Sequence, residues 1–231
     1  MITVETIRGR HSVREYDGKP LSWAEFDALG AVVEECAREC GLDIQLVGDN
    51  PEVFNVIARF GLIRGCRTHV AFVVDDGKAR GVAADEAIGY WGQKIVLAAQ
   101  DMGLNTCWCV LCSRRKSRAV VAPGKKIRLI IAVGHGKTQG FTRKTKSVEA
   151  LSSVECAKAP AWFAAAMEAA QLAPTAMNNQ NFKITLLSDG KTVRIDAPQS
   201  GLNVIDEGIV RCNFEIAANE AGADWRWERE I

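Results

Sequence analysis

Two arginines and a serine stand at alternate positions near the N-terminus, in the segment RHSVREY. They are Arg10, Ser12 and Arg14. In an extended chain, alternate side chains point to the same side, so two guanidinium groups and a hydroxyl can converge on one anion. A phosphate group or the electron-rich edge of a ring system would suit them. A basic strand that faces solvent is the other interpretation of the same residues.

Three of the eight cysteines cluster in the stretch CWCVLC, at Cys107, Cys109 and Cys112. A structural zinc or iron–sulfur site normally takes four ligands, and Cys66 and His69 are the other candidates with suggestive spacing. A half-buried strand is the alternative interpretation, because a free cysteine behaves as a small apolar side chain.

The balance of charge excludes some classes of partner. The 29 Lys and Arg residues oppose 28 Asp and Glu residues, which leaves a formal net charge of +1. Such a chain has no general field that would draw it to nucleic acid or to an anionic membrane. No stretch approaches the roughly 20 apolar residues of a membrane-spanning helix, and MITVETIRGRHS does not resemble a signal peptide. We therefore expect a cytoplasmic protein whose cysteines are reduced thiols.

Hydrophobic spacing predicts the elements that must position these residues. Ser22 and Glu25 form a capping box, and apolar residues then recur at helical spacing until Gly41, which predicts a helix over about 22–40. The same reasoning predicts, in chain order, a strand over 42–47, a helix over 51–60, a strand over 68–76, a helix over 83–102, a strand over 126–136, an exposed basic connection over 136–147, a helix over 159–174, a hairpin over 181–198 that turns at Asp189 and Gly190, and a helix over 203–222.

The chain carries a weak internal repeat. A shift of 119 positions aligns Gly89 with Gly208, the pair Ala98 and Ala99 with Ala217 and Ala218, Gly103 with Gly222, and Trp108 with Trp227. Each copy reads as a long helix with an early small residue, a central alanine pair, a terminal glycine and a tryptophan five residues on. Duplication explains this pattern, and so does coincidence in helices of similar composition.

Four segments together resemble the nitroreductase family. They are RHSVREYDGKPLS, GYWGQKIVLAAQDMGLNTCW, KIRLIIAVGHG followed by RKTKSVEAL, and APTAMNNQNFKI at residues 173–184. The last segment normally follows the first helix of the family, and here it occurs late. The resemblance implies an α+β fold with a mixed central sheet flanked by helices. It also implies two unequal halves, 1–150 and 151–231, that form an intrachain pseudo-dimer, so a monomer is expected although a dimer stays open.

The resemblance implies that FMN is the cofactor. Arg10 and Ser12 would bind its phosphate and ribityl chain, and Arg14 would lie nearer the pyrimidine edge of the ring. The remaining residues implied to contact FMN are His11 beside them, Arg143 and Lys144 as a second phosphate clamp with Lys146 as a substitute, Pro174, Thr175, Ala176 and Asn178 from the other half, and Cys109, Val110 and Leu111 beside the ring. The basic group also reads as a solvated charge run, and PTAMNN as a plain polar turn. The family usually has glycine around Val110, so a bulkier residue there would narrow the pocket.

The implied reaction is a ping-pong transfer of hydride from NAD(P)H through FMN to a small oxidised acceptor, nitroaromatic- or quinone-like. No side-chain nucleophile is required, because the cofactor carries the chemistry. His11 and His135 are candidate proton donors, although histidines are more often structural. Three alternatives stay open: a flavin enzyme with one specific non-nitro substrate, a degenerate FMN- or ligand-binding protein without activity, and a cysteine-rich metal protein.

Overall fold

A computed structural model of the chain describes residues 2–54, 63–77, 82–142, 144–155 and 158–229. The chain forms two compact units. The first unit consists of Met1–Arg8, Gly81–Gln93 and Arg143–Ile231, and the second of Gly9–Arg80 and Lys94–Thr142. One long helix, α3 (Val82–Asp101), contributes residues to both units.

The second unit is built on a four-stranded antiparallel sheet in the order β1-β2-β4-β3. Its strands are β1 (Asp43–Val47), β2 (Thr68–Asp75), β3 (Asn105–Cys109) and β4 (Lys125–Gly134). The central strands β2 and β4 carry the apolar runs VAFVV and LIIAV, whose residues are buried. Such runs are typical of strands that are covered on both faces.

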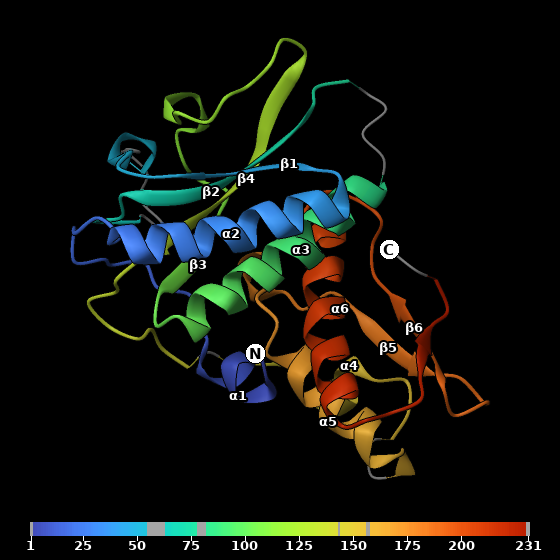
Figure 1. Ribbon diagram of the computed structural model, residues 1–231. Coiled ribbons are helices and arrows are strands. Elements are labelled where there is room, and N and C mark those ends of the chain that lie inside the picture. The colour runs from blue at the N-terminus through green and yellow to red at the C-terminus, as the bar shows by residue number, and fades with distance from the viewer. Residues whose placement is uncertain (1, 55–62, 78–81, 143, 156–157, 230–231) are drawn as a thin grey trace. The chain divides into compact units, whose positions relative to one another are not determined.

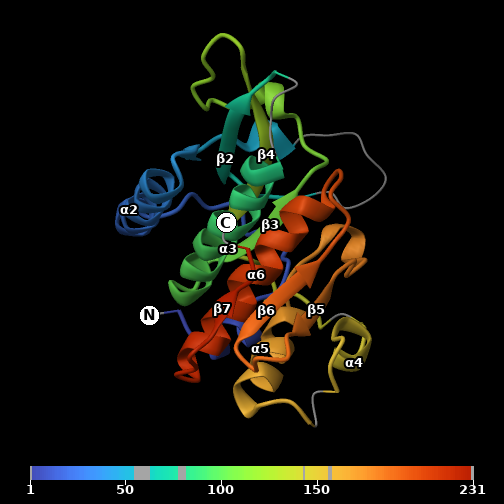
Figure 2. The ribbon, with the colours of Figure 1, turned by 90° about the vertical axis from the view of Figure 1, so that its right-hand side faces the viewer.

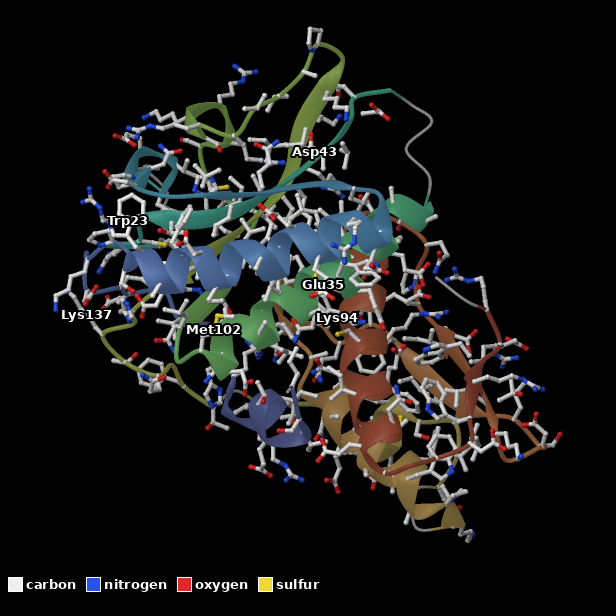
Figure 3. The ribbon with its side chains drawn as sticks, viewed as in Figure 1. Trp23, Glu35, Asp43, Lys94, Met102 and Lys137 are labelled. Atoms are coloured by element: carbon white, nitrogen blue, oxygen red, sulfur yellow. The ribbon has the colours of Figure 1, made fainter. Side chains whose placement is uncertain are left out.

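Helix α2 (Trp23–Cys40) packs against β1 (Figure 1). It begins as predicted, because Ser22 and Glu25 form both hydrogen bonds of the capping box, and it ends at Gly41 with φ of 68°. The apolar stripe of the helix places Leu29 and Val33 in the core. Trp23, in the first turn, is 85% exposed instead (Figure 3).

The first unit contains a three-stranded sheet in the order β5-β6-β7. Strands β5 (Lys183–Leu186) and β6 (Thr192–Asp196) form the predicted hairpin, in which Asp189 accepts hydrogen bonds from the backbone of Lys191 and Thr192. The short strand β7 (Arg226–Trp227) pairs with β6 in parallel. The helices of this unit are α1 (Val4–Gly9), the first part of α3, α4 (Val148–Leu151), α5 (Ala161–Gln171) and α6 (Asn203–Glu220), and α5 packs on α6 (Figure 2).

Helices α3 and α6 approach each other at two glycines, within the first unit. A Cβ atom added at Gly89 would lie 2.0 Å from the carbonyl oxygen of Ile205, and one added at Gly208 would lie 2.0 Å from the carbonyl oxygen of Glu86. The two contacts are reciprocal, because Glu86 and Ile205 each precede the glycine of their own helix by three residues. Only glycine permits backbones to come this close.

The α+β class and most predicted elements are confirmed. The expectation of one mixed central sheet is wrong for the described residues, which form two sheets, and parallel pairing occurs in the smaller one between β6 and β7. The hydrophobic pattern of a strand determines which of its residues are buried, but it does not determine the neighbouring strand. For this reason the sequence did not predict two separate sheets. Of the helix predicted over 51–60, Pro51–Phe54 forms a 3-10 turn, and the rest lies outside the described residues.

Candidate functional site

The N-terminal segment is extended where it meets β3. Ser12 forms a parallel bridge with Thr106, and the backbone N–H of Val13 donates to the carbonyl of Thr106 at 3.0 Å. Arg10 is 4% exposed, whereas Ser12 is half-buried and Arg14 is exposed. The predicted extended conformation is therefore present at Ser12, but the two arginines lie in different environments.

A loop after β4 packs over this segment, and Asn105 holds the loop in place by two hydrogen bonds. The side chain of Asn105 accepts a hydrogen bond from the N–H of Gly136 at 2.9 Å and donates to Gln139 at 2.9 Å. A Cβ atom at Gly136 would lie 2.8 Å from Val13, and one at Gly140 would lie 2.6 Å from the Cβ of His11. Asn105 is therefore a buried amide that orders the loop beside His11 and Ser12.

The segment after α5 has an unusual backbone. Three of its residues other than glycine have positive φ: Met177 at 53°, Asn178 at 57° and Gln180 at 48°. Such conformations cost of order 1–3 kcal/mol each for strained cases and occur mainly where the surroundings impose them, often at ligand sites. Met177 is 92% exposed at the tip of this segment.

Lys144 and Lys146 lie against the same segment. The side-chain amide of Asn178 donates to the carbonyl of Lys144 at 2.7 Å, the N–H of Lys146 donates to Oε1 of Gln180 at 2.7 Å, and Nζ of Lys146 donates to the carbonyl of Gln180 at 3.0 Å. Gln180 also donates to the carbonyl of Gln171 at 2.9 Å. The structure thus brings Lys144 and Lys146 together with the segment Pro174–Asn178. Arg143 lies outside the described residues.

Asp206, which sequence analysis did not identify, forms hydrogen bonds with the backbone of the segment after α5. Both of its carboxylate oxygens accept the backbone N–H of Ala176, at 2.9 and 3.0 Å. The residue is 9% exposed, and burial raises its pKa from 3.8 to about 7, against the opposing effect of the Ala176 hydrogen bond. In a sequence, an acidic residue in the first turn of a helix is already explained by the helix dipole, so the pattern does not indicate a further role for Asp206.

One buried polar atom of this segment has no hydrogen-bond partner. Oδ1 of Asn178 is buried and has no hydrogen-bond partner. A buried acceptor without a donor costs about 1–3 kcal/mol, so such atoms are uncommon and suggest a missing partner. Thr175 is buried nearby in sequence, and its hydroxyl oxygen accepts the N–H of Gln180 at 3.0 Å.

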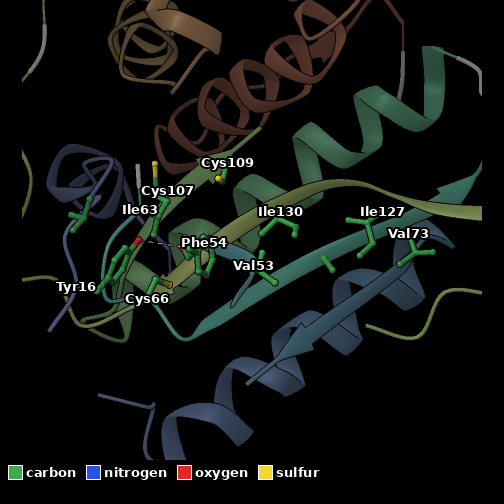
Figure 4. Packing of buried hydrophobic residues seen from close by; sticks show 13 residues of the cluster. Tyr16, Val53, Phe54, Ile63, Cys66, Val73, Cys107, Cys109, Ile127 and Ile130 are labelled. Atoms are coloured by element: carbon green, nitrogen blue, oxygen red, sulfur yellow. Dashed lines mark hydrogen bonds between the residues drawn. The ribbon is translucent and has the colours of Figure 1, made fainter. Parts of the chain in front are cut away.

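The cysteines of the second unit belong mainly to its core. Cys66, Cys107 and Cys109 are buried in one apolar cluster with Tyr16 and Ile130 (Figure 4). No three His, Cys, Asp or Glu residues in the described part of the chain are arranged to hold a metal ion. The stretch CWC forms β3, as the strand interpretation predicted, and after it Val110 and Leu111 are 40% and 60% exposed.

The two other histidines considered above have local partners. His69 is fully buried, its Nε2 lies 2.8 Å from the hydroxyl of Ser117, and burial lowers its pKa to about 4. His135 lies 3.3 Å from the carboxylate of Glu25, at the start of α2. Both arrangements are typical of structural histidines.

Three solved structures with a similar fold are described as nitroreductases. A "putative nitroreductase" of Thermotoga maritima is 20% identical, with a TM-score of 0.66 over 100% of this chain and 90% of that one. A "putative nitroreductase in complex with FMN" from Desulfovibrio desulfuricans is 18% identical, with a TM-score of 0.52 over 66% of this chain and 95% of that one. A "Putative NADH dehydrogenase/NAD(P)H nitroreductase" from Parabacteroides distasonis is 20% identical, with a TM-score of 0.50 over the same shares. The fold is therefore of the nitroreductase class.

The family follows from the sequence match. The family model described as "Putative TM nitroreductase" matches residues 2–218, which is nearly the whole chain, and the protein belongs to that family. A comparison with curated protein sequences gave no match. Among the described residues, no helix is both long and apolar enough to cross a membrane.

Proposed function

We propose that the protein is an FMN-dependent oxidoreductase that transfers hydride from NAD(P)H to a small oxidised acceptor of the nitroaromatic or quinone type. Membership of the nitroreductase family supports the class of reaction. The relative from Desulfovibrio desulfuricans was solved with FMN, and the one from Parabacteroides distasonis is described as an NAD(P)H nitroreductase. When bound, FMN would supply the hydride transfer itself.

The observation that carries the proposal is the orphaned acceptor of Asn178. Its Oδ1 is buried and has no hydrogen-bond donor. The residue has a φ of 57°, and its side-chain N–H donates to the carbonyl of Lys144, which fixes the orientation of the amide. FMN offers several donors, among them the ribityl hydroxyls and the ring N3–H, and the strained segment would be maintained because it presents this acceptor. The unpartnered acceptor of Asn178 therefore fits the hydrogen-bond donors of the cofactor.

The other binding roles in the proposal follow from residue chemistry. Arg10 and Ser12 would bind the phosphate and ribityl chain, with Arg14 as a cation near the pyrimidine edge, where it would favour an anionic reduced ring. Lys144 would add charge to the phosphate clamp. Nζ of Lys146 already donates to Gln180, so its role is to hold the segment in place.

The proposal includes an origin by duplication, with halves at 1–150 and 151–231. The reciprocal contacts of Gly89 and Gly208 support it, because the shift of 119 positions carries Gly89 to Gly208, Glu86 to Ile205 and Tyr90 to Ile209. Gly89 lies against Ile205 and Ile209, and Gly208 lies against the residues equivalent to these two, Glu86 and Tyr90. Such mutual pairing is typical of a two-fold interface between equivalent subunits. A chain that carries both halves would act as a monomer.

The exposure of Leu111 keeps a second candidate open, a family member that binds FMN or another ligand without turnover. Leu111 is 60% exposed and stands in the segment that the resemblance places beside the ring. A leucine at that position would obstruct a stacked substrate. Steady-state oxidation of NAD(P)H by the FMN-loaded protein separates this candidate from the enzyme.

The binding test uses two neighbouring asparagines. FMN affinity is measured by quenching of flavin fluorescence for the wild type, Asn178→Ala and Asn179→Ala. We expect Asn178→Ala to weaken binding about tenfold, because one buried hydrogen bond is worth about 1.5 kcal/mol. Asn179 is exposed, and its substitution should leave the affinity unchanged. Equal affinities for all three proteins would refute the role of Asn178, and no binding by any of them would refute the flavin assignment.

A further inference from the structure

Two cysteines, separated by two residues, lie where β3 ends. Cys109 is the last residue of the strand, and Cys112 follows after the exposed pair Val110 and Leu111. The Sγ atom of Cys109 lies 3.5 Å from the carbonyl oxygen of Leu111, and that of Cys112 lies 3.8 Å from the carbonyl oxygen of Cys109. The thiol of Cys109 also donates a hydrogen bond to the sulfur of Cys112. The chain therefore returns on itself so that the two sulfurs meet.

The two thiols are not equivalent. Cys109 is 5% exposed, whereas Cys112 is half-buried and more accessible to solvent. The hydrogen bond from Cys109 lowers the pKa of Cys112, and the nearby cation of Arg114 adds to this effect while burial opposes it. The same hydrogen bond and burial raise the pKa of Cys109. Arg114 is held in place because its Nη1 donates to the carbonyl of Arg128 at 2.8 Å.

Two other cysteines of the second unit, Cys66 and Cys40, differ from Cys112. Cys66 is buried, its thiol donates to the carbonyls of Thr68 and Val133, and burial raises its pKa to about 12. Cys40 is half-buried like Cys112, yet burial raises its pKa. Accessibility alone therefore does not produce the environment of Cys112. A thiolate stabilised by a neighbouring thiol and a cation favours thiol–disulfide exchange.

We propose that Cys109 and Cys112 form a redox-active dithiol that reduces the disulfide bond of a small molecule. The Cys112 thiolate attacks one sulfur of the substrate disulfide, which forms a mixed disulfide and releases the first substrate thiolate. Cys109 then loses its proton and attacks the sulfur of Cys112, which forms the Cys109–Cys112 disulfide and releases the second thiolate. The substrate gains two electrons, the pair loses two, and both released thiolates take up protons. This activity goes beyond the proposed flavin chemistry and does not depend on it.

The test uses the full chain without added flavin and oxidised glutathione as the probe. After incubation, free thiols are trapped by alkylation in acid, and mass spectrometry of peptides locates disulfides. We expect an intramolecular Cys109–Cys112 disulfide in the wild type and in the control Cys40→Ser, and its reversal by excess reduced glutathione. Cys109→Ser should instead accumulate glutathione on Cys112, because the second attack is removed, and Cys112→Ser should form neither product.

A kinetic measurement keeps the proposal testable if a variant folds poorly. The rate of alkylation of each cysteine by iodoacetamide in the wild type, followed against pH, should reach its midpoint at lower pH for Cys112 than for Cys40. The proposal is overturned if the two cysteines react with the same pH dependence. It is equally overturned if oxidised glutathione leaves both Cys109 and Cys112 as free thiols, or modifies Cys40 and Cys112 at the same rate.

Discussion

Asp206 links the proposed flavin-binding segment to pH. Its carboxylate is 9% exposed and accepts the N–H of Ala176, directly before the strained residues Met177 and Asn178. Burial raises its pKa from 3.8 to about 7 in the folded protein. Between these two values the folded protein holds a proton on Asp206 that the unfolded chain has released, so folding takes up a proton in this range.

The sign and the size of the effect follow from this difference. At a pH below about 4, Asp206 is protonated in both states and burial of a charge costs nothing. As the pH rises from about 4 to about 7, the free energy of unfolding falls, and above about 7 the full cost is present. A rise of the pKa from 3.8 to about 7 corresponds to a cost of about 4 kcal/mol. A neutral side chain would remove this cost.

The assay compares urea unfolding of the wild type, Asp206→Asn and Asp206→Ala at pH 4.5, 6 and 8. We expect Asp206→Asn to gain stability relative to the wild type as the pH rises, by about 3 kcal/mol between pH 4.5 and 8. Asp206→Ala should show the same pH dependence at a lower stability, because it also loses the acceptor for Ala176. The opposite pH dependence of His69, whose pKa is lowered to about 4, cancels in these comparisons.

The reasoning is refuted if the difference in unfolding free energy between the wild type and Asp206→Asn is the same at all three pH values. A difference that changes with the opposite sign, so that the wild type gains stability as the pH rises, would show that the carboxylate is ionised and stabilised in the folded protein. Either result would contradict the raised pKa of Asp206 on which the prediction rests.

Two further predictions concern the first unit. Gly89→Ala and Gly208→Ala should each destabilise the protein by about 2 kcal/mol or more in urea unfolding, because the added Cβ would lie 2.0 Å from a backbone oxygen. The control Gly30→Ala, in α2 with no atom nearer than 4.0 Å to the added Cβ, should stabilise the protein by about 0.5–1 kcal/mol. Equal effects at all three positions would contradict the close helix crossing. Arg211→Met should cost about 3–5 kcal/mol, because the buried carboxylate of Glu86 loses a partner at 3.0 Å, and a thermal midpoint that does not change would show that this ion pair is dispensable.

Local signals in the sequence predicted most of the elements. The capping box of Ser22 and Glu25 marked the start of α2, and the Asp189–Gly190 turn marked the β5–β6 hairpin, because in both cases the hydrogen bonds join residues within three positions. The pairing of strands into two sheets was not predictable in this way. It depends on contacts between segments far apart in the chain, which the alternation of apolar residues does not encode.

The candidate site was predictable in part for the same reason. The motif around Asn178 was found from the family resemblance, and so were Lys144 and Lys146. Their contacts with one another, and the support of Ala176 by Asp206, join residues about 30 positions apart. Sequence patterns give the types of these residues, whereas their partners follow only from the folded chain. The role of each residue toward FMN stays a prediction.

The most direct test of the proposed function is an anaerobic titration of the FMN-loaded protein with NADH and NADPH, followed by its visible absorption. We predict that one equivalent of a reduced nicotinamide bleaches the flavin bands, and that a quinone or a nitroaromatic compound then restores them. A protein that binds FMN but whose spectrum changes with neither nicotinamide would contradict the account.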